Sequence, residues 1–280
     1  MYSCPNRLFV ARKPMFVGSN TFLSQIKRRY GVKKAGFSGT LDPFACGVLI
    51  IAFGQYTKLF RFLKKRPKSY RATLWLGAVS DTLDIEQVER IEKTTPLDEE
   101  KVHETLLSFK GLFTYTPPKY SAKKVGGRRA YDLARRGETV ELPTLSSEIY
   151  DIRLLHYRHP FITFEADVGE GTYIRSLAEA VAVKLGCRGA LSYLERLREG
   201  IFVFRHEEPL NPLDCLEPPK NRYLANSEDL MLGRKLRKES FENPEPGIYT
   251  VVFDQYFAII EIEKSGNVLY LLNKVELCSY

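Results

Sequence analysis

A single carboxylate, Asp42, stands out in the segment KKAGFSGTLDPFACGVLIIAFG, which spans residues 33–54. Glycines and a proline bracket it, two lysines precede it, and an apolar run typical of a buried strand follows it. An aspartate before a proline usually does no more than start a turn or cap a helix. Here the glycines permit the close approach of a large ligand, the lysines could meet phosphates, and the strand would hold the carboxylate rigidly. These features favour a functional role for Asp42 over a purely structural one.

Hydrophobic periodicity predicts the elements that would position Asp42. Ahead of it, residues 19–31 predict a helix that is capped by Ser19 or Asn20. Behind it, the run VLIIAFG predicts a buried strand.

The rest of the first two hundred residues alternates between strand and helix patterns. The segment SYRATLWLG alternates apolar and polar residues, which predicts a strand with Tyr70 on its apolar face. Further elements are expected as a helix at 97–111, strands at 147–157 and 161–171, and a helix at 172–186.

The composition limits the class of protein. The chain has 280 residues, of which 44% are apolar and 12% aromatic, and its formal net charge is +8. A globular core is therefore expected, and the basic excess favours nucleic acid as a partner. The five cysteines include no C-x-x-C pair and the four histidines show no ligand spacing, which predicts a reducing compartment and no structural metal. We expect a cytoplasmic location and no membrane association, because no segment has the pattern of a signal peptide or the length of a membrane span.

The sequence divides into three parts. Residues 1–208 are expected to form a large domain, prolines mark 209–225 as a linker, and short strand patterns predict a small β domain at 226–280. Within the first part, 119–142 is a basic, tyrosine-studded insertion with the composition of an RNA-contacting loop and helix. The cations that we expect to bind RNA there are Lys119, Lys123, Lys124, Arg128 and Arg129. A solvated charged face is the alternative for these side chains.

The segment GFSGTLDPFACGVLIIAFGQYTK resembles the signature of the TruB family of tRNA pseudouridine synthases, whose G-x-x-G-x-L-D-P motif contains the catalytic aspartate. Three further segments match in the same order: KSYRATLWLG, KYSAKKVGGRRAYDLARRG, and GTYIRSLAEAVAVKLGC with LSYLERL after it. The resemblance runs from about Phe9 to Leu197. It implies an α+β catalytic domain of pseudouridine synthase type, with a mixed and mainly antiparallel sheet, followed by a small PUA-like β domain.

The resemblance also implies a reaction. Uridine becomes pseudouridine when the base leaves the sugar at N1 and rejoins it through C5, so no atom enters or leaves and no cofactor is expected. One nucleophile in a closed pocket is enough, and Asp42 would attack either the sugar C1′ or the base. A hydrolytic glycosidase would instead need two cooperating carboxylates, and no second motif-borne acid accompanies Asp42.

The family pattern assigns further residues to the site. Tyr70 and Tyr173 match substrate-contacting tyrosines, with Tyr70 positioning the flipped-out base, and Leu194 matches an apolar pocket contact, although residues of these types are more often core. Arg175 is expected to pair with Asp42. If Thr172 caps the helix at 172–186, the cation falls in the first turn, where the helix dipole disfavours it and an anion must compensate. A phosphate is the other candidate anion, and a helix that begins at SLAE would leave Arg175 outside it.

Two positions depart from the family pattern. Phe37, a substrate-binding candidate, stands where many members carry a histidine, and Phe16 stands where a glycine is common. The resulting prediction is a monomeric enzyme that modifies the T-loop uridine at position 55 in the T arm of tRNA and requires no protein partner. The alternative is a non-catalytic RNA-binding or RNA-chaperone protein on the same scaffold.

Overall fold

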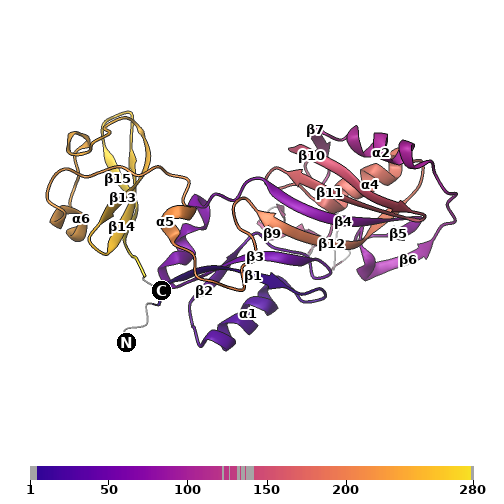
Figure 1. The fold of residues 1–280 in the computed structure, drawn as a ribbon, viewed down its shortest axis with the longest axis horizontal. Coiled ribbons are helices and arrows are strands. Elements are labelled where there is room, and N and C mark those ends of the chain that lie inside the picture. The colour runs from indigo at the N-terminus through magenta and orange to yellow at the C-terminus, as the bar shows by residue number, and fades with distance from the viewer. Residues whose placement is uncertain are drawn as a thin grey trace.

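The computed structural model describes residues 5–278, except 122, 126, 131–132, 134–135 and 137–141, and it describes only the backbone of residues 124, 125 and 129. The molecule is elongated, with a large sheet and its helices toward one end and a smaller sheet at the other (Figure 1). None of the helices in this described part is long and apolar enough to cross a membrane.

The large sheet is mixed and mainly antiparallel. Its strands run in the order β1-β3-β12-β4-β11-β10-β7, with β2 paired to β3, and the pairing is antiparallel everywhere except between β12 and β3. The strands are β1 (Arg7–Lys13), β2 (Ala35–Ser38), β3 (Cys46–Phe53), β4 (Lys68–Leu76), β7 (Gly111–Tyr115), β10 (Leu145–Arg158), β11 (Phe161–Val168) and β12 (Gly189–Glu199). The expected α+β class is confirmed.

Strand β3 explains the apolar run after Asp42, because it is buried on both faces. On one face, Leu49 and Ile51 pack under helix α1 (Ser19–Tyr30). On the other, Val48 and Ile50 pack with the 3₁₀ helix η1 (Gly54–Phe62). Alternate residues of β3 therefore pack into two different cores, so this strand has no polar face.

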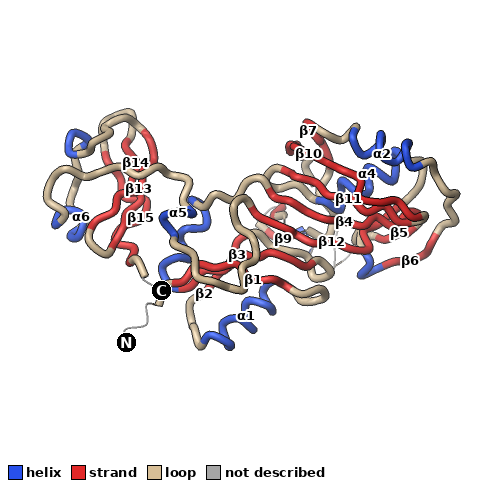
Figure 2. Tube along the Cα trace, viewed as in Figure 1, coloured by secondary structure: helices blue, strands red, loops and turns tan. Residues whose placement is uncertain are grey.

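Helices α2 (Glu99–Leu107) and α4 (Ile174–Lys184) cover one face of the strands beyond β12 and lie together in Figure 2. Leu177 and Val181 of α4 are fully buried against Leu74 and Phe164 of the sheet in a single core cluster. The alternation expected for β4 is confirmed, because Tyr70 lies on this buried face and Arg71 on the other.

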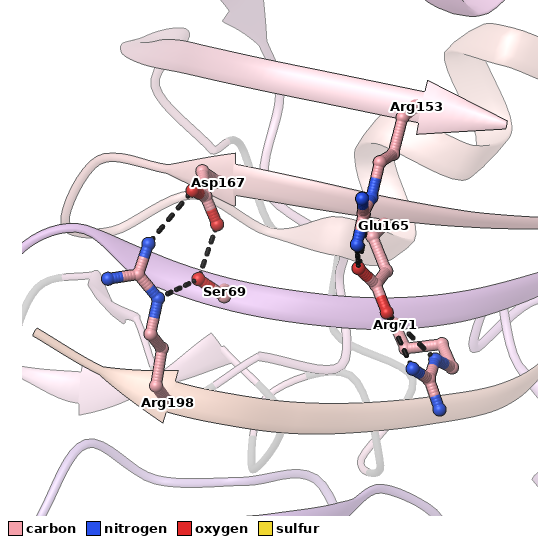
Figure 3. A network of polar contacts seen from close by, with 6 residues as sticks. All are labelled: Ser69, Arg71, Arg153, Glu165, Asp167 and Arg198. Atoms are coloured by element: carbon pink, nitrogen blue, oxygen red, sulfur yellow. Dashed lines mark hydrogen bonds and ion pairs between the residues drawn. The ribbon is translucent and has the colours of Figure 1, made fainter. Parts of the chain in front are cut away.

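The opposite face of β4, β10 and β11 carries charged side chains (Figure 3). Glu165 of β11 lies between Arg71 of β4, at 2.7 Å, and Arg153 of β10. A second group lies on β4, β11 and β12. In it, Arg198 donates to Ser69 at 2.6 Å and to Asp167 at 2.9 Å.

The expected capping of the first helix was wrong. Gly18 occupies the N-cap position of α1, and no side chain caps the helix. The Ser19 hydroxyl instead donates to the Leu41 carbonyl at 2.8 Å and accepts from the Leu41 amide at 3.0 Å. Tertiary contact with the Asp42 turn has therefore replaced the local cap.

The C-terminal sheet is an antiparallel meander of β13 (Gly247–Phe253), β14 (Tyr256–Ile262) and β15 (Val268–Glu276), with helix α6 (Glu228–Leu232) beside it. This sheet is consistent with the expected PUA-like architecture. Segment 209–225 contains α5 (Pro212–Cys215) and is hydrogen-bonded to the large domain, where Leu210 donates to the Leu8 carbonyl at 2.7 Å. It is also bonded to the small sheet, where Asn221 donates to the Thr250 carbonyl at 2.9 Å.

The remaining elements are short. They are β5 (Ala78–Ser80), η2 (Ile85–Gln87), β6 (Val88–Ile91), β8 (Lys124–Val125), β9 (Arg128–Arg129) and η3 (Lys238–Ser240). Cys46, Cys187 and Cys215 are free thiols, whereas Cys278 is disulfide-bonded, which the cysteine pattern did not predict.

Candidate active site

Asp42 lies in the turn between β2 and β3, and its side chain is 33% exposed. The buried ammonium of Lys13 holds this turn, because it donates to the carbonyls of Pro14 at 2.9 Å, Val17 at 2.6 Å and Pro43 at 3.2 Å. Burial lowers the pKa of Lys13 to about 8. With the Ser19–Leu41 hydrogen bonds on its other side, the turn is fixed at both flanks of the carboxylate.

Arg175 pairs with Asp42. Its Nε lies 2.9 Å from Asp42 Oδ2, and the guanidinium is only 3% exposed. The Nε–H does not point along the line to that oxygen, so the contact is an ion pair without an aligned hydrogen bond. The N-cap of α4 is Tyr173, not Thr172, and Arg175 is thus the second residue of the helix, still within its first turn.

A second carboxylate holds the other side of the guanidinium. Arg175 Nη1 lies 3.3 Å from Asp84 Oδ2 and donates to the Thr82 carbonyl at 2.7 Å, and Nη2 donates to the Tyr120 carbonyl at 2.9 Å. Asp84 is 1% exposed, and burial raises its pKa against the hydrogen bond from Thr82 and the charge of Arg175. The positive charge of Arg175 is therefore balanced by two carboxylates, the partly exposed Asp42 and the buried Asp84.

Sequence reasoning missed Asp84. No local signal separates it from Asp81 three residues earlier, which is exposed. The difference comes from tertiary contacts, because Leu191 of β12 pairs beside Asp84 and Arg175 of α4 reaches it from about a hundred residues away.

A cavity of about 460 Å³ opens beside Asp42. Its described lining residues are Gly39, Thr40, Leu41, Asp42, Lys68, Tyr70, Lys123, Glu170, Gly171, Thr172, Tyr173, Ile174, Arg175, Leu194 and Arg196. The volume falls within the range of small-ligand sites. Its wall combines rings, apolar side chains and several cations, which suits a nucleotide.

The two tyrosines and the leucine expected at the site line this cavity and also belong to the core. Tyr70 is 8% exposed and Leu194 5%, and both are members of the cluster under α4. Tyr173 packs against that cluster, and burial raises its pKa. The core and site interpretations of these side chains are therefore compatible.

Two further cations that line the cavity, Arg196 and Lys68, were not predicted as site residues from the sequence. Arg196 is 1% exposed and donates to the carbonyls of Val48 at 2.8 Å and Gly39 at 2.9 Å. Glu199 lies 3.4 Å from Arg196 and 3.5 Å from Lys68, and it is completely buried. Gly39 has φ +65°, and a Cβ there would meet the Arg196 and Glu199 side chains at 3.1–3.3 Å. The turn thus needs glycine at this position.

The remaining predicted residues lie in different places. Phe37 packs half-buried against the core under α1 and does not line the cavity. Lys123 lines the cavity, and Lys119 and Arg128 are exposed. Lys124 and Arg129 pair through their backbones in β8 and β9, but their side chains lie outside the described part of the chain.

Comparison with known proteins identifies the family. Residues 27–174 match the model described as TruB family pseudouridylate synthase (N terminal domain). The chain belongs to the TruB family. It is 59% identical over 270 residues to tRNA pseudouridine synthase B of a Nitratiruptor species, covering 96% of this chain and 98% of that protein. A similar relative of the same description from a Sulfurovum species is 51% identical over 96% of this chain and 97% of its own.

Solved structures show the same fold as this TruB family member. A Cbf5-Nop10-Gar1 complex contains a chain that superposes with a TM-score of 0.68 at 17% identity, over 97% of this chain and 84% of that one. A chain of an H/ACA RNP bound to a substrate RNA containing 2'-deoxyuridine superposes with a TM-score of 0.66 at 17% identity, over 97% and 85% of the two chains. The protein is a pseudouridine synthase, which is an isomerase.

Proposed function

We propose that this enzyme isomerises one uridine in the T loop of tRNA, conventionally position 55, and that Asp42 is its nucleophile. The observation that carries the proposal is the partly exposed Asp42 carboxylate at the cavity wall, 2.9 Å from the buried Arg175. tRNA as the substrate is supported by relatives of 59% and 51% identity whose names specify tRNA.

The reaction needs one carboxylate and a closed site. An oxygen of Asp42 attacks the sugar C1′ or the base, the N1–C1′ bond breaks, and a C5–C1′ bond forms on the same base and sugar while the bond to Asp42 breaks and frees the carboxylate. C5 gives up a proton and N1 gains one, so the atoms balance without a cofactor. Arg175 positions the carboxylate throughout, because its own place is fixed by the Thr82 and Tyr120 carbonyls and by Asp84.

The target uridine must leave its stack to reach Asp42. In the proposed complex it enters the cavity beside Tyr70, while Leu194 and Tyr173 pack around it. The cations at the cavity wall and the exposed Lys119 and Arg128 meet the backbone phosphates of the T arm. The polarity of the wall supports this placement, since rings and cations together recognise unstacked RNA.

We further propose that the enzyme acts as a monomer in the cytoplasm, without a protein partner. The support is chemical: the reaction needs no second substrate, and one chain carries the nucleophile, the positioning arginine and the cationic wall. Size-exclusion chromatography with light scattering, during turnover of tRNA, would show a species of one chain.

Mapping the product tests the proposal. The purified chain is incubated with an unmodified tRNA transcript and pseudouridine is located with a reagent that marks it. The expected result is stoichiometric modification at the T-loop uridine and none in a transcript with cytidine there. Binding without any pseudouridine would support the non-catalytic RNA-binding alternative, and product at another position would contradict the T-loop assignment.

A further inference from the structure

Phe16, in the turn between β1 and α1, combines two unfavourable properties. Its backbone has φ +61°, in the left-handed region, and its side chain is 64% exposed. Among the described residues, it is the only non-glycine residue with positive φ whose exposed side chain is large and apolar. Neither property stabilises the folded chain.

Stability does not explain a phenylalanine at this position. A left-handed backbone costs an L-residue free energy that glycine avoids, because the Cβ crowds the neighbouring carbonyl. A buried ring would offset that cost, but most of the Phe16 ring faces solvent. Backbone strain that is held in place without a packing reason tends to mark a functional position.

The turn that carries Phe16 is fastened to the Asp42 turn. The Lys13 ammonium donates to the carbonyls of Val17 at 2.6 Å and Pro43 at 3.2 Å, so these two oxygens lie less than about 6 Å apart. Val17 follows Phe16 directly, and Pro43 follows Asp42. The Ser19–Leu41 hydrogen bonds at 2.8 and 3.0 Å join the same two segments again. Phe16 is thus held in a fixed position close to the turn that carries Asp42.

The reaction creates a need for an aromatic surface there. When the target uridine leaves the stack, the bases next to it lose a stacking partner. An exposed aromatic ring fixed beside the site can replace that partner, and base–aromatic stacking tolerates any base because every base has a π-face.

We propose that Phe16 stacks on a nucleobase of the substrate RNA next to the flipped uridine, which rests on the proposed function. The ring holds the RNA open around the emptied position and does not touch the reacting atoms. Phe16 is therefore a substrate-binding residue that contributes to RNA affinity more than to the chemical step. Its strained backbone directs the ring outward to meet the RNA.

Phe16→Gly separates this role from a structural one. Removing the ring should weaken binding of a T-arm hairpin RNA about 5- to 140-fold, the range measured for base–aromatic contacts. Because glycine relieves the left-handed strain, the melting temperature should not fall below that of the wild type. At saturating RNA kcat should stay within a few-fold, so the loss appears in KM. Phe16→Tyr, which keeps the ring, should restore affinity.

Phe161→Ala is the matched control. Phe161 is another exposed aromatic residue, at 37%, but it packs on Trp75 on the polar face of the sheet, at 5.6 Å between ring centroids. Its loss should leave RNA affinity unchanged. An affinity for Phe16→Gly equal to that of the wild type would overturn the proposal.

A spectroscopic measurement reports the contact directly. The chain has one tryptophan, Trp75, so Phe16→Trp in a Trp75→Phe background places a single fluorophore at the turn. Addition of the hairpin RNA should quench its emission with the same concentration dependence as binding, and unchanged emission at saturation would overturn the proposal. Wild-type product at the T-loop uridine is measured in parallel, so a failure of the proposed function is distinguished from a failure of the Phe16 contact.

Discussion

At the residue scale, Arg175 lies between a partly exposed carboxylate, Asp42, and a buried one, Asp84. Asp42 is 33% exposed and Asp84 only 1%, and the guanidinium lies within 3.3 Å of both. A charge buried to this degree is tolerated only when it is paired and hydrogen-bonded. Asp84 therefore holds Arg175 in place beside Asp42, the proposed nucleophile, and we regard Asp84 as a positioning residue.

Asp84→Asn should reduce turnover about 10- to 100-fold while RNA affinity stays within a few-fold, because Arg175 loses one of its two anionic partners but keeps its carbonyl acceptors. Single-turnover pseudouridine formation measures the loss. Asp81→Asn is the control, since Asp81 is exposed in the same segment. Equal rates for the two variants would show that Asp84 has no part in positioning Arg175.

Arg175→Lys should also lose most of the activity, although it keeps the positive charge. A lysine has no planar fork with which to reach Asp42, Asp84 and the two carbonyls together. Arg175→Met should lose more, because it also leaves Asp84 buried without its cation. Turnover at saturating RNA and the melting temperature are measured together, and full activity in the lysine variant would refute the positioning role.

The sequence predicts most of the site residues to which the family pattern assigns a role, and it misses residues that only the folded sheet brings to the site. Asp42, Tyr70, Tyr173 and Leu194 meet at one cavity as expected, and the Asp42–Arg175 pair is present. Asp84 was missed because its burial depends on β12 and α4. Phe37 was expected at the substrate, but it packs under α1.

At the element scale, the sheet brings the site together through one strand that periodicity did not reveal. β12 runs parallel to β3 and antiparallel to β4, and it carries both Leu194 and Arg196 into the cavity. The close approach to β3 requires Gly47, where a Cβ would lie 2.2 Å from the Arg196 carbonyl oxygen. Strand patterns for β3, β4, β10 and β11 were visible locally, but a parallel pairing between distant segments leaves no local pattern.

The polar face of the sheet gives a pH-dependent prediction at this scale. Burial would raise the pKa of Glu165, but hydrogen bonds from Arg153 and Arg71 outweigh it and hold the pKa below its usual 4.5. Just below pH 4.5 the unfolded chain therefore binds more protons at Glu165 than the folded chain does. The stability that Glu165 contributes at neutral pH is lost as the pH falls through the pKa of Glu165 in the folded chain. Glu165→Gln should cost about 1 kcal/mol at pH 7.

Thermal unfolding of wild type and Glu165→Gln across pH 3–7 measures this effect. The gap between the two melting temperatures should narrow below pH 4.5. A difference in melting temperature that stays constant from pH 3 to pH 7 would mean that the charge of Glu165 does not stabilise the three strands.

At the scale of the whole molecule, the small sheet packs against the large domain and helps to stabilise it. Phe257, Ile259 and Val275 of the small sheet share one buried cluster with Leu8 and Tyr56 of the large domain. The Cys278 amide also donates to the Tyr56 hydroxyl at 3.2 Å. The boundary that composition suggested at residue 209 marks a change of sheet, but buried contacts continue across it.

Phe257→Ala should therefore destabilise the entire protein. The side chain is fully buried in the shared cluster, and truncation of a buried phenylalanine costs about 3–5 kcal/mol. Calorimetry should show one transition, shifted down as a whole. Two separate transitions, with the upper one unchanged, would mean that the sheets unfold independently.

The central claim is that Asp42 is the nucleophile of a tRNA pseudouridine synthase, and the most direct measurement compares Asp42→Asn with the wild type. Each enzyme is mixed in excess over a T-arm RNA, and pseudouridine formation is followed over a single turnover. RNA affinity is measured in parallel. Asparagine fills the same space but cannot form the covalent intermediate. The account predicts no product from Asp42→Asn and an affinity within a few-fold of the wild type. Product from that variant at a rate near the wild type's would contradict it.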